Sequence, residues 1–178
     1  YLSHANTNYP MPKAIISPHA GFIYSAPVAA EGYACLLNNK KQFDRVVLVG
    51  PSHRYPFDGI AVTSADALNT PLGNIPIDKN LIKKLSGLSQ VTLLDDAFNT
   101  PENSLETQLP FLQSVIDEFS IVPLLLGNVN YNDVAEVLKI LWNGDNTLIV
   151  IVATSFPLPD VIVNVPSDIS EGIVKEEL

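Results

Sequence analysis

The sequence Arg45-Val46-Val47-Leu48-Val49-Gly50-Pro51-Ser52-His53-Arg54 decides the fold, because it joins a continuous apolar run to a polar turn that contains a histidine. An unbroken β-branched run of this kind is typical of a strand buried on both faces of a parallel sheet. The same arrangement occurs upstream, where residues 13–17 (KAIIS) lead into Pro18-His19-Ala20-Gly21. The sequence therefore predicts two strands that each end just before a histidine.

A helix is predicted between these two strands. It runs from Ser25 to about Asn38, with Ser25 as its cap and Pro27 in its first turn. Its apolar positions recur at helical spacing, and many of them are alanine, which favours close packing on a sheet. Strand, helix and strand in this order predict a βαβ unit with a parallel sheet, in which the two strands are neighbours.

The remaining apolar runs extend this pattern. Further strands are predicted at 58–64, 91–94, 120–126, 147–153 and, more briefly, 161–165. Helices are predicted at 78–86 with Asp78 as cap, over about 105–116 with a kink or boundary at Pro110, and from a cap at Asn132 or Asp133. The fold class is therefore α/β, in three layers, with a central, mostly parallel sheet flanked by helices. We expect one domain over residues 1–178, with an atypical, proline-rich and acidic segment at 156–178.

The composition of the chain limits the partners and the cellular compartment that we expect. The chain has 178 residues, 10 Lys plus Arg against 19 Asp plus Glu, and a formal net charge of -9. Such a surface repels phosphate backbones and anionic lipid, so we expect no nucleic-acid or membrane partner. Cys35 is the single cysteine, which excludes an internal disulfide and favours a reducing compartment. The polar start of the chain does not match a signal peptide, and we expect a cytoplasmic protein.

The two histidines are the first candidates for chemistry. In open α/β sheets, ligands bind where loops leave the carboxyl ends of strands, and His19 and His53 both follow such ends. Two imidazoles there could bind a first-row transition metal, or one could act as a general base. A hydrogen-bonded histidine in a loop without such a role is the alternative, and spacing alone leaves both interpretations open.

Other polar residues could complete a site. Glu102, Ser104 and Glu106 stand near the predicted start of a helix, where backbone N–H groups favour an anion, although the glutamates could also simply stabilise that helix. Arg54 could clamp an anion, and Tyr24 could hydrogen-bond a substrate or pack. The nucleotide-binding patterns G-x-x-x-x-G-K-[ST] and G-x-G-x-x-G after the first strand are absent from the sequence, as is the G-x-S-x-G nucleophile elbow.

Four motifs in order give the sequence a family resemblance. They are Pro18-His19-Ala20-Gly21-Phe22-Ile23-Tyr24-Ser25, Gly50-Pro51-Ser52-His53, Thr70-Pro71-Leu72-Gly73 and Asn103-Ser104-Leu105-Glu106-Thr107-Gln108-Leu109-Pro110-Phe111-Leu112. Together they resemble the MEMO family, whose bacterial and archaeal members are also called AmmeMemoRadiSam system protein B. The similarity extends from about Lys13 to Ser155.

The resemblance implies a fold similar to class III extradiol (LigB-type) dioxygenases. It implies that His19 and His53 hold a non-haem metal, with iron first and copper or zinc as alternatives, and that the protein has a redox role. It also implies a small molecule or peptide as ligand and a radical-SAM protein as partner. Tyr24, Ser52, Arg54, Asn103 and Ser104 would line the pocket, and Glu102 would act beside the histidines.

Three departures from the family pattern bear on these expectations. The family usually has Glu-His-Ser where this sequence has Glu102-Asn103-Ser104, and an amide cannot replace an imidazole as ligand or proton carrier. After Ser155 the sequence diverges from the family's Ser-Ser-Asp-Leu-Ser-His-type run. The family's opening segment and its C-terminal portion, with a cysteine near the site, have no counterpart, and Cys35 does not match that cysteine in position.

These observations support competing hypotheses. The first is a metal-dependent, dioxygenase-like oxidoreductase site at His19 and His53. The second is a module that binds a peptide or small anion in the same pocket without turnover, which the Asn103 substitution favours. A third is a structural remnant without an intact site.

Overall fold

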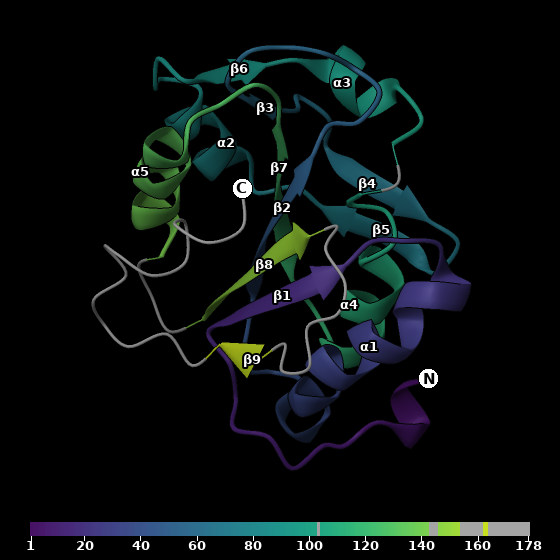
Figure 1. Cartoon of the computed structure of the whole chain (residues 1–178). Coiled ribbons are helices and arrows are strands. Elements are labelled where there is room, and N and C mark those ends of the chain that lie inside the picture. The colour runs from purple at the N-terminus through teal and green to yellow at the C-terminus, as the bar shows by residue number, and fades with distance from the viewer. Residues whose placement is uncertain (103, 143–145, 154–161, 164–178) are drawn as a thin grey trace.

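The computed structural model describes residues 1–102, 104–142, 146–153 and 162–163, which form an α/β fold around one main sheet (Figure 1). The sheet has seven strands among these residues. In spatial order they are β6 (Val91–Leu93), β3 (Ile60–Val62), β7 (Ser120–Leu126), β2 (Arg45–Pro51), β8 (Thr147–Ala153), β1 (Ala14–Pro18) and β9 (Ile162–Val163). A separate antiparallel hairpin consists of β4 (Ala67–Thr70) and β5 (Gly73–Pro76).

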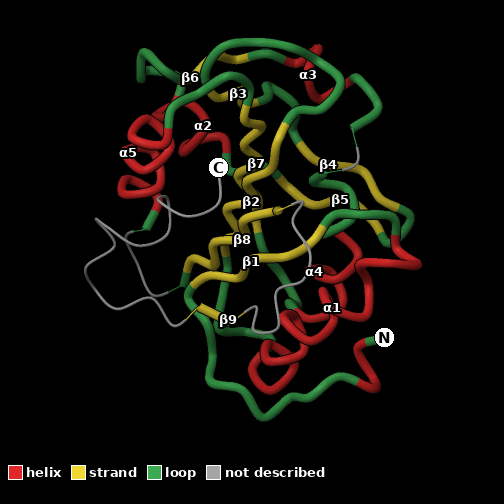
Figure 2. Tube along the Cα trace, in the orientation of Figure 1, coloured by secondary structure: helices red, strands yellow, loops and turns green. Residues whose placement is uncertain are grey.

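The helices lie on both faces of the main sheet. They are α1 (Phe22–Ala34), α2 (Lys79–Leu85), α3 (Asp95–Asn99), α4 (Leu109–Val115) and α5 (Tyr131–Leu141), with two 3₁₀ helices, η1 (Leu2–His4) and η2 (Cys35–Asn39). Figures 1 and 2 show α1 and α4 on one face, and α2 and α5 on the other. The predicted three-layer architecture is confirmed.

Most of the main sheet is parallel. β1 with β8, β8 with β2, β2 with β7, and β3 with β6 are parallel pairs, whereas β3 with β7 and β1 with β9 are antiparallel. The predicted strands 120–126 and 147–153 match β7 and β8 residue for residue. Their unbroken apolar runs fit strands covered on both faces, since most of their side chains are buried.

The expectation that the first two predicted strands are neighbours is wrong. β8 lies between β1 and β2 and pairs with both (Figure 1). The connection from β1 through α1 to β2 therefore passes over one strand, β8. The most apolar strand of the sequence occupies this inner place, as its composition indicated.

Helix α1 begins earlier than predicted. Its N-cap is Gly21, so Ser25 lies inside the helix, where its hydroxyl donates to the Ala20 carbonyl at 2.6 Å. Pro27 also lies inside the helix rather than in its first turn. The helix is anchored on α4 by Phe111, whose ring stacks between Phe22 and Tyr33 at centroid distances of 5.5 and 5.2 Å. Such pairs contribute about 0.5–1.5 kcal/mol each beyond their buried area.

Two other helix starts differ from the prediction. Residues 104–108 form turns, and α4 begins at Leu109 with Pro110 in its first turn, where a missing N–H costs nothing. The predicted boundary at Pro110 is therefore confirmed, but Glu102, Ser104 and Glu106 precede the helix. Helix α5 is capped by Asn130, whose side chain accepts from the Asp133 N–H, and not by Asn132 or Asp133. The predicted Asp78 cap of α2 is confirmed.

The C-terminal segment contributes β9, which pairs antiparallel with β1. The rest of the predicted atypical segment 156–178 lies outside the described residues. Within the described chain, the helices are all too short or too polar to cross a bilayer.

Candidate functional site

Three strands of the main sheet end at the same level. Pro18 at the end of β1 pairs with Ala153 at the end of β8. On the other side of β8, β2 continues two residues beyond its last pair, Val49 with Ile151, to end at Pro51. Because neighbouring strands lie about 4.8 Å apart, the ends of β1 and β2 are separated by roughly 10 Å. Side chains that leave these two ends can meet above the end of β8.

His19 and His53 make that contact. His19 directly follows β1, His53 follows β2 by two residues, and their Nε2 atoms lie 2.9 Å apart. The two rings are tilted by 34°, with centroids 5.2 Å apart. His19 is only 8% exposed, whereas His53 faces solvent. The pair therefore consists of one buried and one accessible imidazole.

The contact constrains the protons of both rings. At hydrogen-bonding distance one Nε2 must donate and the other must accept, so the two Nε2 atoms share one proton. Burial, followed by the nearby His53, lowers the pKa of His19, while the Glu102 carboxylate and the backbone of Ala153 oppose this shift. His19 is thus neutral at pH 7, which is the form that can ligate a metal.

Glu102 holds the turn that carries His53. Its Oε2 accepts from the backbone N–H of His53 at 2.5 Å, and its Oε1 accepts from the Ser104 N–H at 3.3 Å. The residue is 6% exposed. A buried carboxylate that accepts backbone N–H groups fixes the path of the chain around it. Glu102 therefore positions His53 through the backbone.

The segment after Glu102 packs against the end of β2. The buried Ser104 hydroxyl donates to the Pro51 carbonyl at 2.8 Å. A Cβ atom added to Gly50 would lie 2.7 Å from Leu105 Cδ2 and 3.1 Å from Ser104 Oγ. Glycine at position 50 thus allows the segment that carries Glu102 to approach the strand that carries His53.

Gln108 is a structural residue of the site that we did not predict. It is fully buried, and its Nε2 donates to the carbonyl of Pro18, the residue before His19, at 3.0 Å. Its Oε1 accepts from the Tyr33 hydroxyl at 2.9 Å, which ties α1 to the same point. Gln108 is a polar residue at helical spacing from Leu105 and Leu112, on an apolar face. That position is the signal that could have identified it.

The other predicted site residues lie differently. Tyr24 is 73% exposed in the first turn of α1, and Arg54 is also exposed. Ser52 closes the turn after β2, because its hydroxyl donates to the Tyr55 carbonyl at 2.8 Å. No described hydrogen bond joins these three residues to the histidine pair. Asn103 lies outside the described residues.

The histidine pair fits two positions of a metal coordination shell. Two nitrogens that are each 2.0–2.1 Å from one ion lie about 2.8–3.4 Å apart, depending on the ligand angle. The observed 2.9 Å falls in this range. The Nδ1 atom of His19 is buried and makes no hydrogen bond of good geometry with the described residues, although the backbone of Ala153 lies close enough to raise the pKa of the ring. The described part of the chain contains no group of three His, Cys, Asp or Glu side chains arranged to hold a metal.

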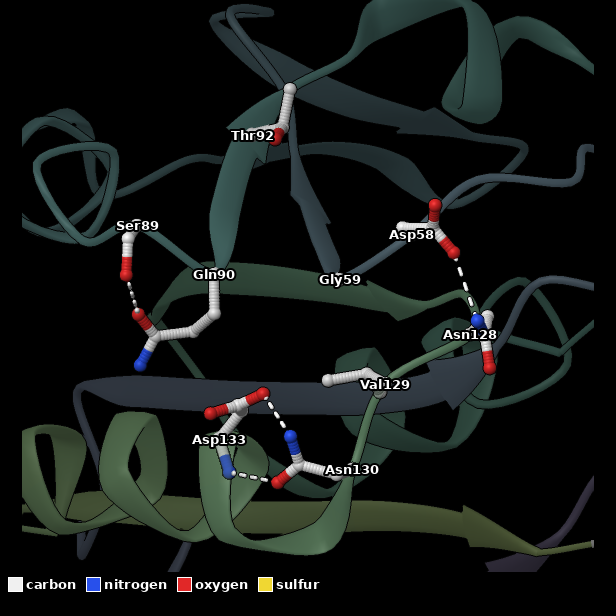
Figure 3. A pocket seen from close by; sticks show the side chains of 9 residues that line it. All are labelled: Asp58, Gly59, Ser89, Gln90, Thr92, Asn128, Val129, Asn130 and Asp133. Atoms are coloured by element: carbon white, nitrogen blue, oxygen red, sulfur yellow. Dashed lines mark hydrogen bonds between the residues drawn. The ribbon is translucent and has the colours of Figure 1, made fainter.

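A separate polar cavity of about 560 Å³ lies at the far part of the sheet, near β3, β6 and the start of α5 (Figure 3). Its side chains are engaged with one another: Asn128 donates to Asp58 at 2.9 Å, and Asn130 donates to Asp133. Figure 3 also shows Ser89 donating to Gln90, at 3.4 Å. None of the residues predicted for the site lines this cavity.

Comparison with known proteins identifies the family. The model of the Memo-like protein family matches residues 2–157. The chain belongs to the Memo-like family. It is 34% identical over 157 residues to a MEMO1 family protein of Methanococcus maripaludis, and 33% identical over 150 residues to one of Thermotoga neapolitana. A MEMO1 family protein of Metallosphaera sedula is 39% identical over 111 residues.

These matches cover more of this chain than of the relatives. They span 84%, 83% and 62% of this chain, but 55%, 54% and 39% of the relatives from Methanococcus, Thermotoga and Metallosphaera. The chain thus spans about half the length of the curated relatives it matches. The resemblance drawn from the four sequence motifs is confirmed at the level of the family.

Proposed function

We propose that this Memo-like protein holds a metal ion between His19 and His53 and uses it in dioxygenase-like or other redox chemistry on a small molecule. The observation that carries the proposal is the 2.9 Å separation of the two Nε2 atoms, one of them on a buried imidazole that stays neutral at pH 7. Iron is the first candidate, with copper or zinc as alternatives. When bound, such an ion supplies Lewis-acid chemistry, and iron or copper also supplies redox chemistry.

The protein's own residues have distinct roles in this proposal. His19 and His53 would hold the ion through their imidazole nitrogens, which requires that neither Nε2 keeps the proton that they share in the structure. Glu102 keeps the His53 backbone in place. Gln108 does the same for the residue before His19. Within the family, a radical-SAM protein is the partner that we propose.

The test is calorimetric titration with Fe²⁺ under anaerobic conditions, and separately with Zn²⁺. The wild-type protein should bind one equivalent, and His19→Ala and His53→Ala should each weaken binding at least tenfold. The exposed His4 supplies the matched control, since His4→Ala removes an imidazole remote from the pair in sequence and should leave the titration unchanged. Equal binding by all four proteins would refute the proposal.

A second candidate function is binding of a peptide or small anion in the same pocket without turnover. It is favoured by the lack of a three-residue ligand group in the described chain and by Asn103, where the family usually has histidine. A ligand complex whose affinity is unchanged by chelators, together with no metal in the titration above, would support this function over the first.

A further inference from the structure

A second cavity adjoins the histidine pair through Glu102. It has a volume of about 260 Å³ and lies between the β4–β5 hairpin and the segment that leads into α4. Most of its wall is hydrocarbon, from Ala67, Leu68, Phe98, Leu105, Leu109 and Leu125. Pockets for small molecules typically combine such a wall with a few polar groups that set orientation.

The charged groups of this cavity are all acidic. Glu102 and Glu106 both line it, together with the uncharged Thr63, Asn69 and Asn99, and no lining residue carries a positive side chain. Partial burial, followed by the charge of Glu102, raises the pKa of Glu106, although Glu106 keeps an exposed face. The two carboxylates thus repel each other, and a cation beside them would relieve this repulsion.

Glu102 belongs to both sites. Its carboxylate accepts the His53 N–H at 2.5 Å and the Ser104 N–H at 3.3 Å, and the residue also lines the cavity. A ligand held here would therefore contact the residue that supports the backbone of His53. Leu105, Glu106 and Leu109 line the same cavity as Glu102.

We propose that this cavity binds the apolar part of a small cationic ligand, with its ammonium group against Glu102 and Glu106. The inference rests on the proposed function, for which it names the substrate class: a primary amine on a ring or short branched chain. A water molecule takes up about 30 Å³ in the liquid, and if each non-hydrogen atom of the ligand is given the same space, the cavity holds roughly nine atoms, about one six-membered ring with a short side chain. An anionic ligand of the same size should bind more weakly, because the two carboxylates repel it.

The test uses 2-phenylethylamine and phenylacetate, which share the ring and the chain length but carry opposite charges. Metal-free protein in chelator is titrated with each compound while the methyl NMR signals of Leu105, Leu109 and Leu125 are followed. The amine should shift these signals, and phenylacetate should bind at least tenfold more weakly. Equal affinity for the two compounds, or no shift at these methyl groups, would overturn the proposal.

Variants locate the interaction. Glu106→Gln should weaken amine binding about fivefold, the upper range for one partly exposed charge pair. Glu118→Gln, which removes an exposed glutamate that does not line this cavity, should leave it unchanged. Ala67→Phe should fill the cavity and abolish binding of the ring. If Glu106→Gln and Glu118→Gln behave alike, the ammonium position is wrong.

The test of amine binding in the cavity can be distinguished from the test of metal binding at the histidine pair. Amine binding by metal-free wild-type protein and by His19→Ala would support the cavity even if the Fe²⁺ titration showed no binding. Stoichiometric metal binding combined with no amine binding would refute the cavity and leave the metal site standing.

Discussion

Replacement of Glu102 by alanine tests how the site is held together. The carboxylate accepts a hydrogen bond from His53 N at 2.5 Å and a longer one from Ser104 N at 3.3 Å. A charge-assisted hydrogen bond contributes about 1.5–3 kcal/mol, and we assign the longer bond roughly 0.5 kcal/mol. Glu102→Ala should therefore lower the free energy of unfolding by about 3 kcal/mol, which corresponds to a decrease in Tm of about 6–12 °C for a domain of this size.

Urea unfolding followed by circular dichroism measures this loss. Glu102→Gln keeps one carbonyl oxygen as acceptor without the charge, and it should recover about half of the loss. Glu136→Ala is the matched control, because it removes an exposed carboxylate that accepts from Gln90 at 2.7 Å, and it should cost at most about 0.5 kcal/mol. If Glu102→Ala unfolds at the same urea concentration as the wild type, the carboxylate does not support the His53 turn.

Three further changes probe the same region and its surroundings. Gly50→Ala should lower the free energy of unfolding by about 1–3 kcal/mol because its Cβ would lie 2.7 Å from the buried Leu105, whereas Gly87→Ala meets only ordinary contacts; denaturant unfolding of both variants checks this. Burial raises the pKa of the Cys35 thiol to about 11. The thiol should therefore resist a disulfide reagent at pH 8 in the native protein and react readily in urea. Rapid labelling of the native protein would contradict this burial. His19 has a lowered pKa in the fold, so below pH 6.5 the unfolded chain takes up its proton first and stability falls as the pH falls. The free energy of unfolding should fall by at most about 1.4 kcal/mol between pH 7.5 and 5.5 because of this group. Denaturant unfolding at the two pH values should show a smaller decrease in His19→Gln than in the wild type, and an unchanged decrease in His4→Gln.

Local patterns in the sequence predicted much of the fold. The runs at 120–126 and 147–153 are strands at those bounds because each is continuously apolar and covered on both faces. Asp78 caps α2 through its own side chain, a contact over three residues that sequence spacing reveals. The boundary at Pro110 follows in the same way from its missing N–H.

The order of strands could not be predicted by the same reasoning. β8 enters between β1 and β2 although it is separated from them by about a hundred residues, and no local pattern records which strands pair. We had expected the two histidines to leave adjacent strands. They meet instead across the end of β8, which lies between their strands. The connections of Gln108 to Pro18 and Tyr33 likewise depend on three segments that only the folded chain brings together.

The most direct test of the account is an NMR titration of the histidine ring nitrogens with Zn²⁺, a diamagnetic stand-in for iron. We predict that the Nε2 signals of His19 and His53 shift together and stop shifting at one equivalent of Zn²⁺. The signals of the two ring nitrogens of the exposed His4 should not shift. If the His19 and His53 signals do not respond, or respond only in parallel with His4, then the pair at 2.9 Å is a hydrogen bond within the fold and not a metal site.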